Sequence, residues 1–350
     1  MNTPFLIAVV VLIAAGITAA LLYRPKKPRH FESVYTDALN AIVHGDNKTA
    51  LRLLREVVKR DTNHINAYLQ MGEILRAEGN PHQAIKIHQS LTVRPNLENQ
   101  LQIDIHRSLA LDYMEVQNYV KAKNEAEFIL KIEKKNIWAL EFLLDLAEQQ
   151  HDWIQAAAVA KDIQKITQQK DPGNLAKFQM FEGLDHLGKN DRERAKKCFV
   201  KAIEIDSTYG QAHERLGDFY ADDRDLIKAI DHWEKFAHLD VENASNIFTK
   251  METALYDLGR YGEVEKFYKR LLDKNPGNLD ALARMANVLE EKGERQQALD
   301  LVDTALKQFE DSVHTRLMKL KLSLTNSPPH ELSRQIDKII DLITENKEIS

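Results

Sequence analysis

Residues 213–236 read HERLGDFYADDRDLIKAIDHWEKF, which is two helix-forming segments joined by a short polar turn. Leu216 and Gly217 lie in the first segment, and Ala229 and Trp233 lie in the second, each set on one helix face. The two small residues, twelve apart, would let the helices approach closely, while the large ones fill the groove to a neighbouring pair. Since one such pair cannot bury its own apolar face, the segment predicts further copies along the chain.

The same small-to-small spacing returns elsewhere, in the pairs Ala38 with Ala50, Gly72 with Ala84, Ala110 with Ala122, Gly183 with Ala195, and Ala286 with Ala298. Two copies are weaker, Leu144 with Ala156 and Glu252 with Val264. Counted from the first helix, the copies begin at residues 31, 65, 103, 137, 176, 210, 245 and 279. Two longer steps fall at VRPNLENQ and QQKDPGN, whose Pro and Gly residues predict loop insertions.

This period of about 34 residues, with its Leu-Gly, Tyr, Ala and aromatic positions, resembles the tetratricopeptide repeat. After residue 30 the sequence has no alternating run of β-branched residues that would indicate a strand. We therefore predict an all-α fold, a right-handed superhelix of about eight helix pairs over residues 31–312. Residues 313–350, broken at SPPHE and more polar at the end, are expected to form a degenerate ninth pair and C-terminal cap.

The first thirty residues differ in kind. Residues 4–23 read PFLIAVVVLIAAGITAALLY and carry no charge, and about 30 Å of helix of this kind crosses a bilayer. They follow a short tail, residues 1–3, and precede a basic linker, residues 24–30, that contains Arg24, Lys26, Lys27 and Arg29. A cleaved signal peptide is the alternative, but its apolar core is usually shorter and preceded by basic residues. We predict a retained transmembrane helix with the four basic residues at the membrane surface, on the cytoplasmic side.

Charge and composition exclude several classes of function. The chain has 48 basic and 53 acidic residues, and the four basic residues before residue 31 leave residues 31–350 with a net charge of −9. Such a body is a poor match for nucleic acid. The lone cysteine, Cys198, excludes an internal disulfide and any cysteine-based zinc or iron–sulfur site. Since no HExxH motif, phosphate loop or nucleophile motif occurs, we expect no enzymatic activity, cofactor, metal site or small-molecule substrate.

Two residues of catalytic type are interpreted as packing residues. His88 stands where other copies have Phe199, Trp233 and Tyr268, so we expect a half-buried histidine inside its helix pair. Cys198 lies on the second helix of its repeat and is expected to be a small packing residue.

In tetratricopeptide proteins the first helix of each pair lines a concave groove, so the resemblance implies a partner-binding surface there. The residues it selects are Tyr35, Leu39, Leu69, Glu73, Arg76, Arg107, Glu141, Asp145, Glu148, Glu214, Asp218 and Asp222. The acidic members follow one helix face and predict an acidic groove for a basic segment, the alternative being an ordinary solvated face. Near the anchor the groove is apolar, at Tyr35, Leu39, Ile42, Val43 and Leu69. That end could grip an apolar segment or pack under the anchor.

The chain also resembles the bacterial lipopolysaccharide assembly protein B family, which has an N-terminal anchor, adjacent basic residues and about nine such helix pairs. Residues 72–91, GEILRAEGNPHQAIKIHQSL, are similar to the family pattern GNLFRxRGExxRAIRIHQxL, and Ile87, His88 and Gln89 are its least generic part. The following segment, LALDYMEVQNYVKAKNEAE, matches the family at Asp112 and Tyr113.

This resemblance implies an adaptor in the bacterial inner membrane, with a periplasmic N-terminus and cytoplasmic repeats, that brings a lipid A biosynthetic enzyme to a membrane protease. Its implied partners are protein clients in the groove, other inner-membrane proteins and the lipid bilayer. The family's C-terminal rubredoxin-like domain uses two CxxC pairs, and we expect it to be lacking because the sequence has one cysteine. The alternatives are a tetratricopeptide scaffold for a secretion, pilus or division complex, or a secreted periplasmic repeat protein.

Overall fold

The computed structural model describes residues 31–324 and 327–348, and the regular structure in these residues is helical throughout, with no strand. The chain divides into two compact units, residues 1–146 and 147–350, and each is described by itself. Across the described residues, no helix has both the length and the apolar character needed to cross a bilayer. The expected anchor, residues 4–23, and the four basic residues after it lie outside the described residues.

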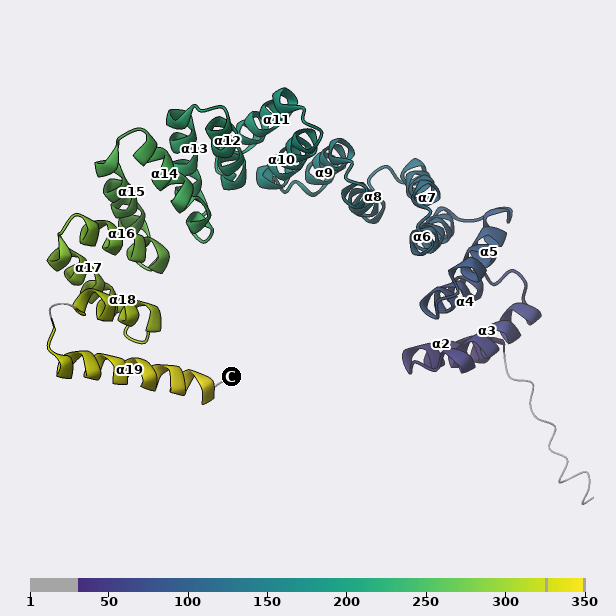
Figure 1. Ribbon diagram of the computed structural model, residues 1–350. Helices are drawn as coiled ribbons and strands as arrows, with labels where there is room; N and C mark the ends of the chain where they lie inside the picture. Colours follow the sequence, from purple (N-terminus) through teal and green to yellow (C-terminus); the bar gives the residue numbers. More distant parts are fainter. Residues whose placement is uncertain (1–30, 325–326, 349–350) are drawn as a thin grey trace, which may run out of the picture. The chain divides into compact units, whose positions relative to one another are not determined.

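The first unit consists of helical hairpins with short turns (Figure 1). Its pairs are α2 (Phe31–Val43) with α3 (Asn47–Arg60), α4 (Ile65–Ala77) with α5 (Pro81–Thr92), and α6 (Asn99–Glu115) with α7 (Tyr119–Ile132). Helix α8 (Ile137–Gln149) begins in this unit.

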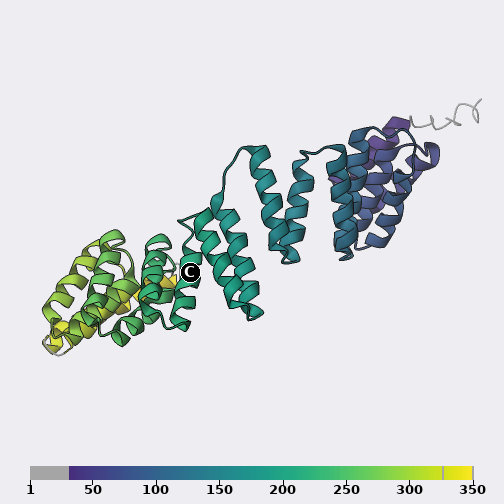
Figure 2. The same cartoon turned by 90° about the horizontal axis from the view of Figure 1, so that it is seen from above.

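The second unit continues the same pattern, and Figure 2 shows neighbouring helices of each unit lying alongside one another. It contains α9 (Trp153–Thr167), α10 (Pro172–Gly188), α11 (Arg192–Ile205), α12 (Gly210–Asp222) and α13 (Leu226–Leu239). A 3-10 helix, η1 (Ala244–Ile247), leads into α14 (Phe248–Asp257), which is followed by α15 (Tyr261–Lys274), α16 (Leu279–Glu291), α17 (Arg295–Gln308), α18 (Val313–Ser323) and α19 (Pro329–Glu348).

The all-α prediction is confirmed, and first helices begin at residues 31, 65, 137, 210 and 279 as expected. The loop insertion predicted at VRPNLENQ is confirmed in part, because residues 93–98 form a longer linker than residues 61–64, although α6 begins four residues early, at Asn99. The insertion predicted at QQKDPGN was wrong, because α10 begins at Pro172 and gains an N-terminal turn. In α10 the cause is local: Pro172 is compatible with a first helical turn, and the Asp171 carboxylate accepts a hydrogen bond from the Asn174 N–H at 2.9 Å. The division into repeats 31–312 and a cap 313–350 stays a prediction.

A single turn type joins the two helices in each of the eight pairs between residues 31 and 308. The second of its three residues is always left-handed, with φ between 55° and 83°, at Gly45, Gly79, Gln117, His151, Asn190, Arg224, Gly259 and Gly293. In five turns the next side chain accepts a hydrogen bond from the second helix, as Asp46, Asn118, Asp152, Asp191 and Asp225 do. The left-handed residue ends the first helix, and the N-cap residue starts the second.

The core of each pair forms at the expected small residues. Ala50, Ala84 and Ala195 are completely buried. A Cβ atom built on Gly72 would lie 2.2 Å from Nε2 of His88, and one on Gly217 would lie 2.3 Å from Cδ1 of Trp233. The close helix approach predicted from the spacing is therefore confirmed, and it allows the large residues to fill the space between pairs.

Candidate protein-binding groove

A cavity of about 420 Å³ opens on the first helices of the first unit. Its lining comes from α2, α4 and α6, and consists of Tyr35, Asn66, Leu69, Gln70, Glu73, Asp104, Arg107, Ser108 and Leu111. Tyr35, Leu69 and Arg107 occupy equivalent positions of three successive repeats, so stacking of the pairs places them in one row. Four predicted groove residues line this cavity, and their role in binding stays a prediction.

The other lining residues were not selected from the sequence, although the repeat contains a signal for them. Asn66 and Asp104 hold the same repeat position, and so do Gln70 and Ser108, one residue after Leu69 and Arg107. Leu39 is half-buried on α2 but does not line the cavity. Nearby Val43 is exposed, while Ile42 packs against the core of α2 to α5.

The cavity combines apolar surface with charges of both signs. The Glu73 carboxylate accepts a hydrogen bond from Gln70 Nε2 at 3.0 Å, and the Arg107 guanidinium lies over the Trp138 ring, 4.8 Å from its centroid. Burial and then the Glu73 charge raise the pKa of Tyr35, so its hydroxyl stays protonated at neutral pH. The surface can therefore offer aromatic and aliphatic contacts together with an anionic and a cationic group.

A buried network fixes the wall of this cavity. His88 Nδ1 lies 2.6 Å from Oδ2 of Asp112, and Arg76 donates from Nη1 to Oδ1 of the same carboxylate at 2.8 Å. His88 Nε2 is 3.3 Å from the carbonyl oxygen of Leu69, and Arg76 Nη1 is 3.4 Å from that of Ser108. The network thus contacts the backbone at two lining residues, on α4 and on α6.

The expectation of a half-buried His88 was wrong, because both His88 and Asp112 are completely buried. Its partner lies on the next repeat, and nothing in the local sequence indicates a buried hydrogen bond of this kind. Arg76, predicted to bind a partner, directs its guanidinium to Asp112, and 20% of its side chain is exposed.

Most of the predicted acidic groove residues of the second unit form ion pairs with neighbouring repeats. Asp218 accepts hydrogen bonds from Lys250 Nζ at 2.7 Å and from Trp233 Nε1 at 3.0 Å. Glu148 lies 3.3 Å from Lys177 Nζ. Asp222 lies 3.3 Å from Arg192, but both side chains there are largely exposed. These contacts lower the negative charge available to a basic partner.

Three other predicted acidic residues, two in the first unit and one in the second, are less engaged. Glu141 and Asp145 are exposed on α8, and Glu214 is half-buried on α12. Within residues 31–324 and 327–348, none of the three has an ion-pair partner. Asp218 and Asp222 also line a second cavity, of about 630 Å³, between α12, α13 and α14.

The structure also brings together three side chains that could hold a metal ion, which sequence motifs did not indicate. Glu182 and His186 lie one turn apart on α10, and Cys198 faces them from α11, with their ligand atoms all within 4.8 Å of one another. Burial and then the Glu182 charge raise the pKa of the Cys198 thiol. A thiol in this state is a weak nucleophile.

Comparison with known proteins finds repeat models and relatives that are similar to this chain in sequence. Tetratricopeptide repeat models match residues 255–320 and 186–209. Lipopolysaccharide assembly protein B of Escherichia coli (strain K12) is 25% identical over 256 residues, which cover 73% of this chain and 66% of the relative. The Haemophilus influenzae protein of the same name is 21% identical, covering 75% of this chain and 68% of the relative.

Among solved structures, one of Naa15/Naa10 bound to HypK-THB superimposes on 90% of this chain and 51% of that chain, with a TM-score of 0.44 and 17% identity. The chain spans about two thirds of the length of the Escherichia coli relative it matches. Both the repeats and the resemblance inferred from residues 72–127 are confirmed. The chain contains tetratricopeptide repeats and is similar to lipopolysaccharide assembly protein B over 73% of its length.

Proposed function

We propose that this chain is a non-enzymatic, protein-binding adaptor in lipopolysaccharide assembly. The observation that carries the proposal is the cavity on α2, α4 and α6, which presents equivalent side chains of successive repeats on one surface. Similarity to lipopolysaccharide assembly protein B supports the process, and the tetratricopeptide repeats support a protein as the ligand. Helices packed in this way provide an extended surface that one client segment can follow.

The chemistry of the cavity favours a mixed client segment. Tyr35 and Leu111 offer apolar contacts, while Glu73, Asp104 and Arg107 offer charges of both signs. A segment with one apolar anchor between a basic and an acidic residue would match this arrangement. A uniformly charged segment would meet a like charge on at least one side.

The client in this proposal is a lipid A biosynthetic enzyme, which the chain brings to a membrane protease. Residues 4–23 anchor the chain in the inner membrane, with the repeats in the cytoplasm. Confinement to the membrane raises the effective concentration of the adaptor near other membrane proteins. A reporter fused after Ser350 tests the orientation, because alkaline phosphatase activity there would contradict a cytoplasmic body and favour the periplasmic alternative.

The first test is the half-life of the lipid A deacetylase in cells. We expect the enzyme to persist longer without this protein, and also in cells carrying Arg107→Glu, which reverses the charge in the cavity. Lys86→Glu is the matched control, because Lys86 is exposed on α5, outside the cavity. An unchanged half-life in the absence of the protein would rule out this enzyme as the client.

The second test identifies the client directly. A photo-crosslinking residue at Asn66, exposed in the cavity, is expected to form an adduct with the client. The same residue at Val120, which is 72% exposed on α7, should not. An adduct with a component of a secretion, pilus or division complex would favour the scaffold function instead.

A further inference from the structure

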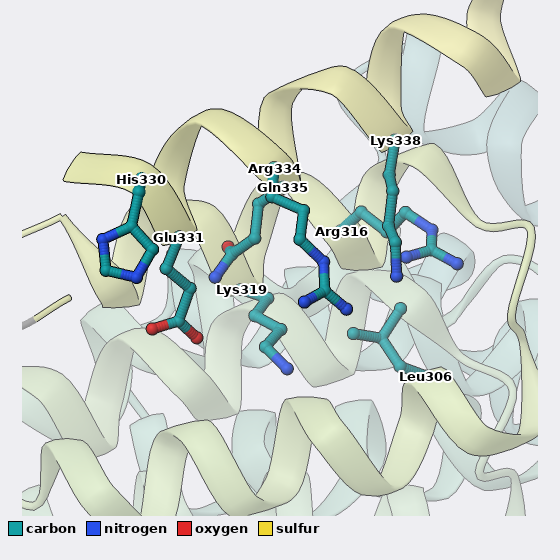
Figure 3. Close-up of a pocket in the computed structure, with 8 residues that line it drawn as sticks. All are labelled: Leu306, Arg316, Lys319, His330, Glu331, Arg334, Gln335 and Lys338. Atoms are coloured by element: carbon teal, nitrogen blue, oxygen red, sulfur yellow. The ribbon is translucent and has the colours of Figure 1, made fainter. Parts of the chain in front are cut away.

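A third, differently charged cavity lies at the C-terminal end of the second unit, between α17, α18 and α19 (Figure 3). Its volume is about 320 Å³, and its lining includes four cationic side chains, Arg316, Lys319, Arg334 and Lys338. The lining holds one carboxylate, Glu331. The fixed charges of the lining residues therefore sum to +3, in a chain whose net charge is −5. The repeat pattern did not indicate this cavity.

Two of the four cations have partners within the chain. Lys319 Nζ lies 2.6 Å from Oδ1 of Asp303, and Arg316 donates from Nε and Nη2 to the carbonyl oxygen of Glu310 at 3.0 and 2.6 Å. For Arg334 and Lys338, the described part of the chain supplies neither an ion pair nor a hydrogen bond. These two residues are one helical turn apart on α19, so their charges repel each other.

The two repelling charges both lie at the cavity. In Figure 3 the guanidinium group of Arg334 and the amino group of Lys338 point into the space above Leu306, with Arg316 beside Lys338 and Lys319 to the left of Leu306. Gln335 also lines the cavity, and its Oε1 is buried without a hydrogen-bond partner. Rotation of that amide would present its NH2 group to a bound acceptor instead.

From this geometry we propose that the cavity binds a phosphate-bearing ligand with at least two negative charges. A guanidinium group can bind two phosphate oxygens at once. An ammonium group is a point charge that can bind a third phosphate oxygen. Bound phosphates would offset the repulsion between Arg334 and Lys338, so binding also stabilises the C-terminal helices. The small volume favours a phosphate group over a folded acidic partner.

Inorganic pyrophosphate is the probe for this proposal, titrated calorimetrically into the full chain in zwitterionic micelles. We expect saturable binding and a higher Tm with pyrophosphate. Arg334→Gln and Lys338→Gln should each weaken binding about tenfold, since each removes a charge-assisted contact. Lys307→Gln is the matched control, because Lys307 is an exposed lysine on α17 outside the cavity, and it should bind like the unaltered chain.

Misfolding of a variant can be recognised without ligand. Removing Arg334 or Lys338 relieves a like-charge pair, so the Tm of each unliganded variant should equal or exceed that of the unaltered chain. Addition of phosphatidic acid to the micelles distinguishes two sources of the ligand. A weaker apparent affinity for pyrophosphate would identify a lipid headgroup, and an unchanged affinity would identify a soluble phosphate compound.

Three results would overturn the proposal. One is the absence of heat and of a Tm shift at low salt, and another is an equal loss of binding in Lys307→Gln, which would indicate unspecific charge attraction. The third is stronger competition by a hexaglutamate peptide than by inorganic phosphate, which would assign the cavity to an acidic protein segment.

Discussion

At the scale of single residues, the least generic part of the sequence forms a joint between two helix pairs. His88 contacts Asp112, and the neighbouring Gln89 donates from Nε2 to the Tyr113 hydroxyl at 2.7 Å. His88 and Gln89 of the first segment therefore both have their partners in the second segment that resembles the family. Since a buried carboxylate without partners is strongly destabilising, the joint explains why these residues occur together.

Gly72→Ala should destabilise the protein through this joint. The new Cβ would lie 2.2 Å from His88 Nε2, and the ring cannot move away without losing its contact with Asp112. We expect the free energy of unfolding to fall by about 3 kcal/mol, measured by urea denaturation. Gly188→Ala is the control, since a Cβ there meets nothing within 4 Å and should cost little. Equal stability of the two variants would show that His88 is not held in this position.

A second residue pair predicts a dependence of stability on pH. His213 Nδ1 and His232 Nδ1 are 3.0 Å apart, so one ring donates and both cannot be protonated there. Burial, followed by the charge of His213, lowers the pKa of His232 to about 4. The unfolded chain therefore binds the proton more readily than the folded chain between pH 6.5 and about 4.

This stabilisation is complete above pH 6.5 and is lost as the pH falls towards 4, and solvent screening of the half-buried ring limits the loss to about 2 kcal/mol. In His232→Phe, urea midpoints measured across this range should fall less steeply. His82→Phe is the comparison, because His82 is exposed at the start of α5 and should keep the steep profile. Identical profiles for the unaltered chain and His232→Phe would assign the acid sensitivity to other groups.

At the scale of elements, the size of a residue on the first helix of a pair is related to the size of the residue sixteen positions later, on the second helix. Gly72, Gly183 and Gly217 are each followed sixteen residues later by a ring, at His88, Phe199 and Trp233. Where Ala38, Ala110 and Ala286 hold the same position, the later residue is aliphatic, at Leu54, Ala126 and Val302. Pairs with Gly can bring the backbone closer to a large side chain, so total volume is conserved.

The left-handed residue of the turn within each pair is glycine in four repeats and another residue in the other four. Gln117 adopts φ 55° although only glycine does so without strain, and it is exposed. Gln117→Gly should therefore raise the free energy of unfolding by up to about 1 kcal/mol, less the entropy that glycine adds to the unfolded chain. Thermal unfolding measures this, with Gly79→Ala as the reverse substitution, which should lower stability because Gly79 has φ 77°. A loss of stability in Gln117→Gly would contradict the strain.

At the scale of the whole molecule, charge pairing between repeats gives most of the acidic stripe residues of the second unit a structural role. In the second unit the carboxylate of a first helix binds a cation on the next first helix, as Asp218 does with Lys250 and Glu252 with Arg284, each 32 residues apart. Glu290 similarly lies 3.3 Å from Lys321. These acidic residues stabilise the stacking of pairs, so an acidic sequence here does not by itself indicate an acidic binding surface.

Glu141 and Asp145 therefore provide the sharper test of a basic client. Changing both to Lys should weaken client capture at low salt and leave the Tm unchanged, since their side chains are exposed. Asp218→Lys, in contrast, should lower the Tm because it leaves Lys250 and the Trp233 N–H without their acceptor. Pull-down with the captured client measures the first effect. If the unaltered chain captures it equally at low and high salt, the acidic stripe has no part in binding.

Sequence periodicity was sufficient for the helix pairs, their order and most helix starts, because each pair is held by small residues at a fixed short spacing. It placed the starts of α6 and α10 four residues late, and at Pro172 it suggested a loop although Pro is compatible with a first helical turn. The first-unit cavity, the His88–Asp112 hydrogen bond and the cationic cavity at α19 emerged only from the tertiary structure. Their residues lie on different helices, some in neighbouring repeats, and they become neighbours only when the helices stack.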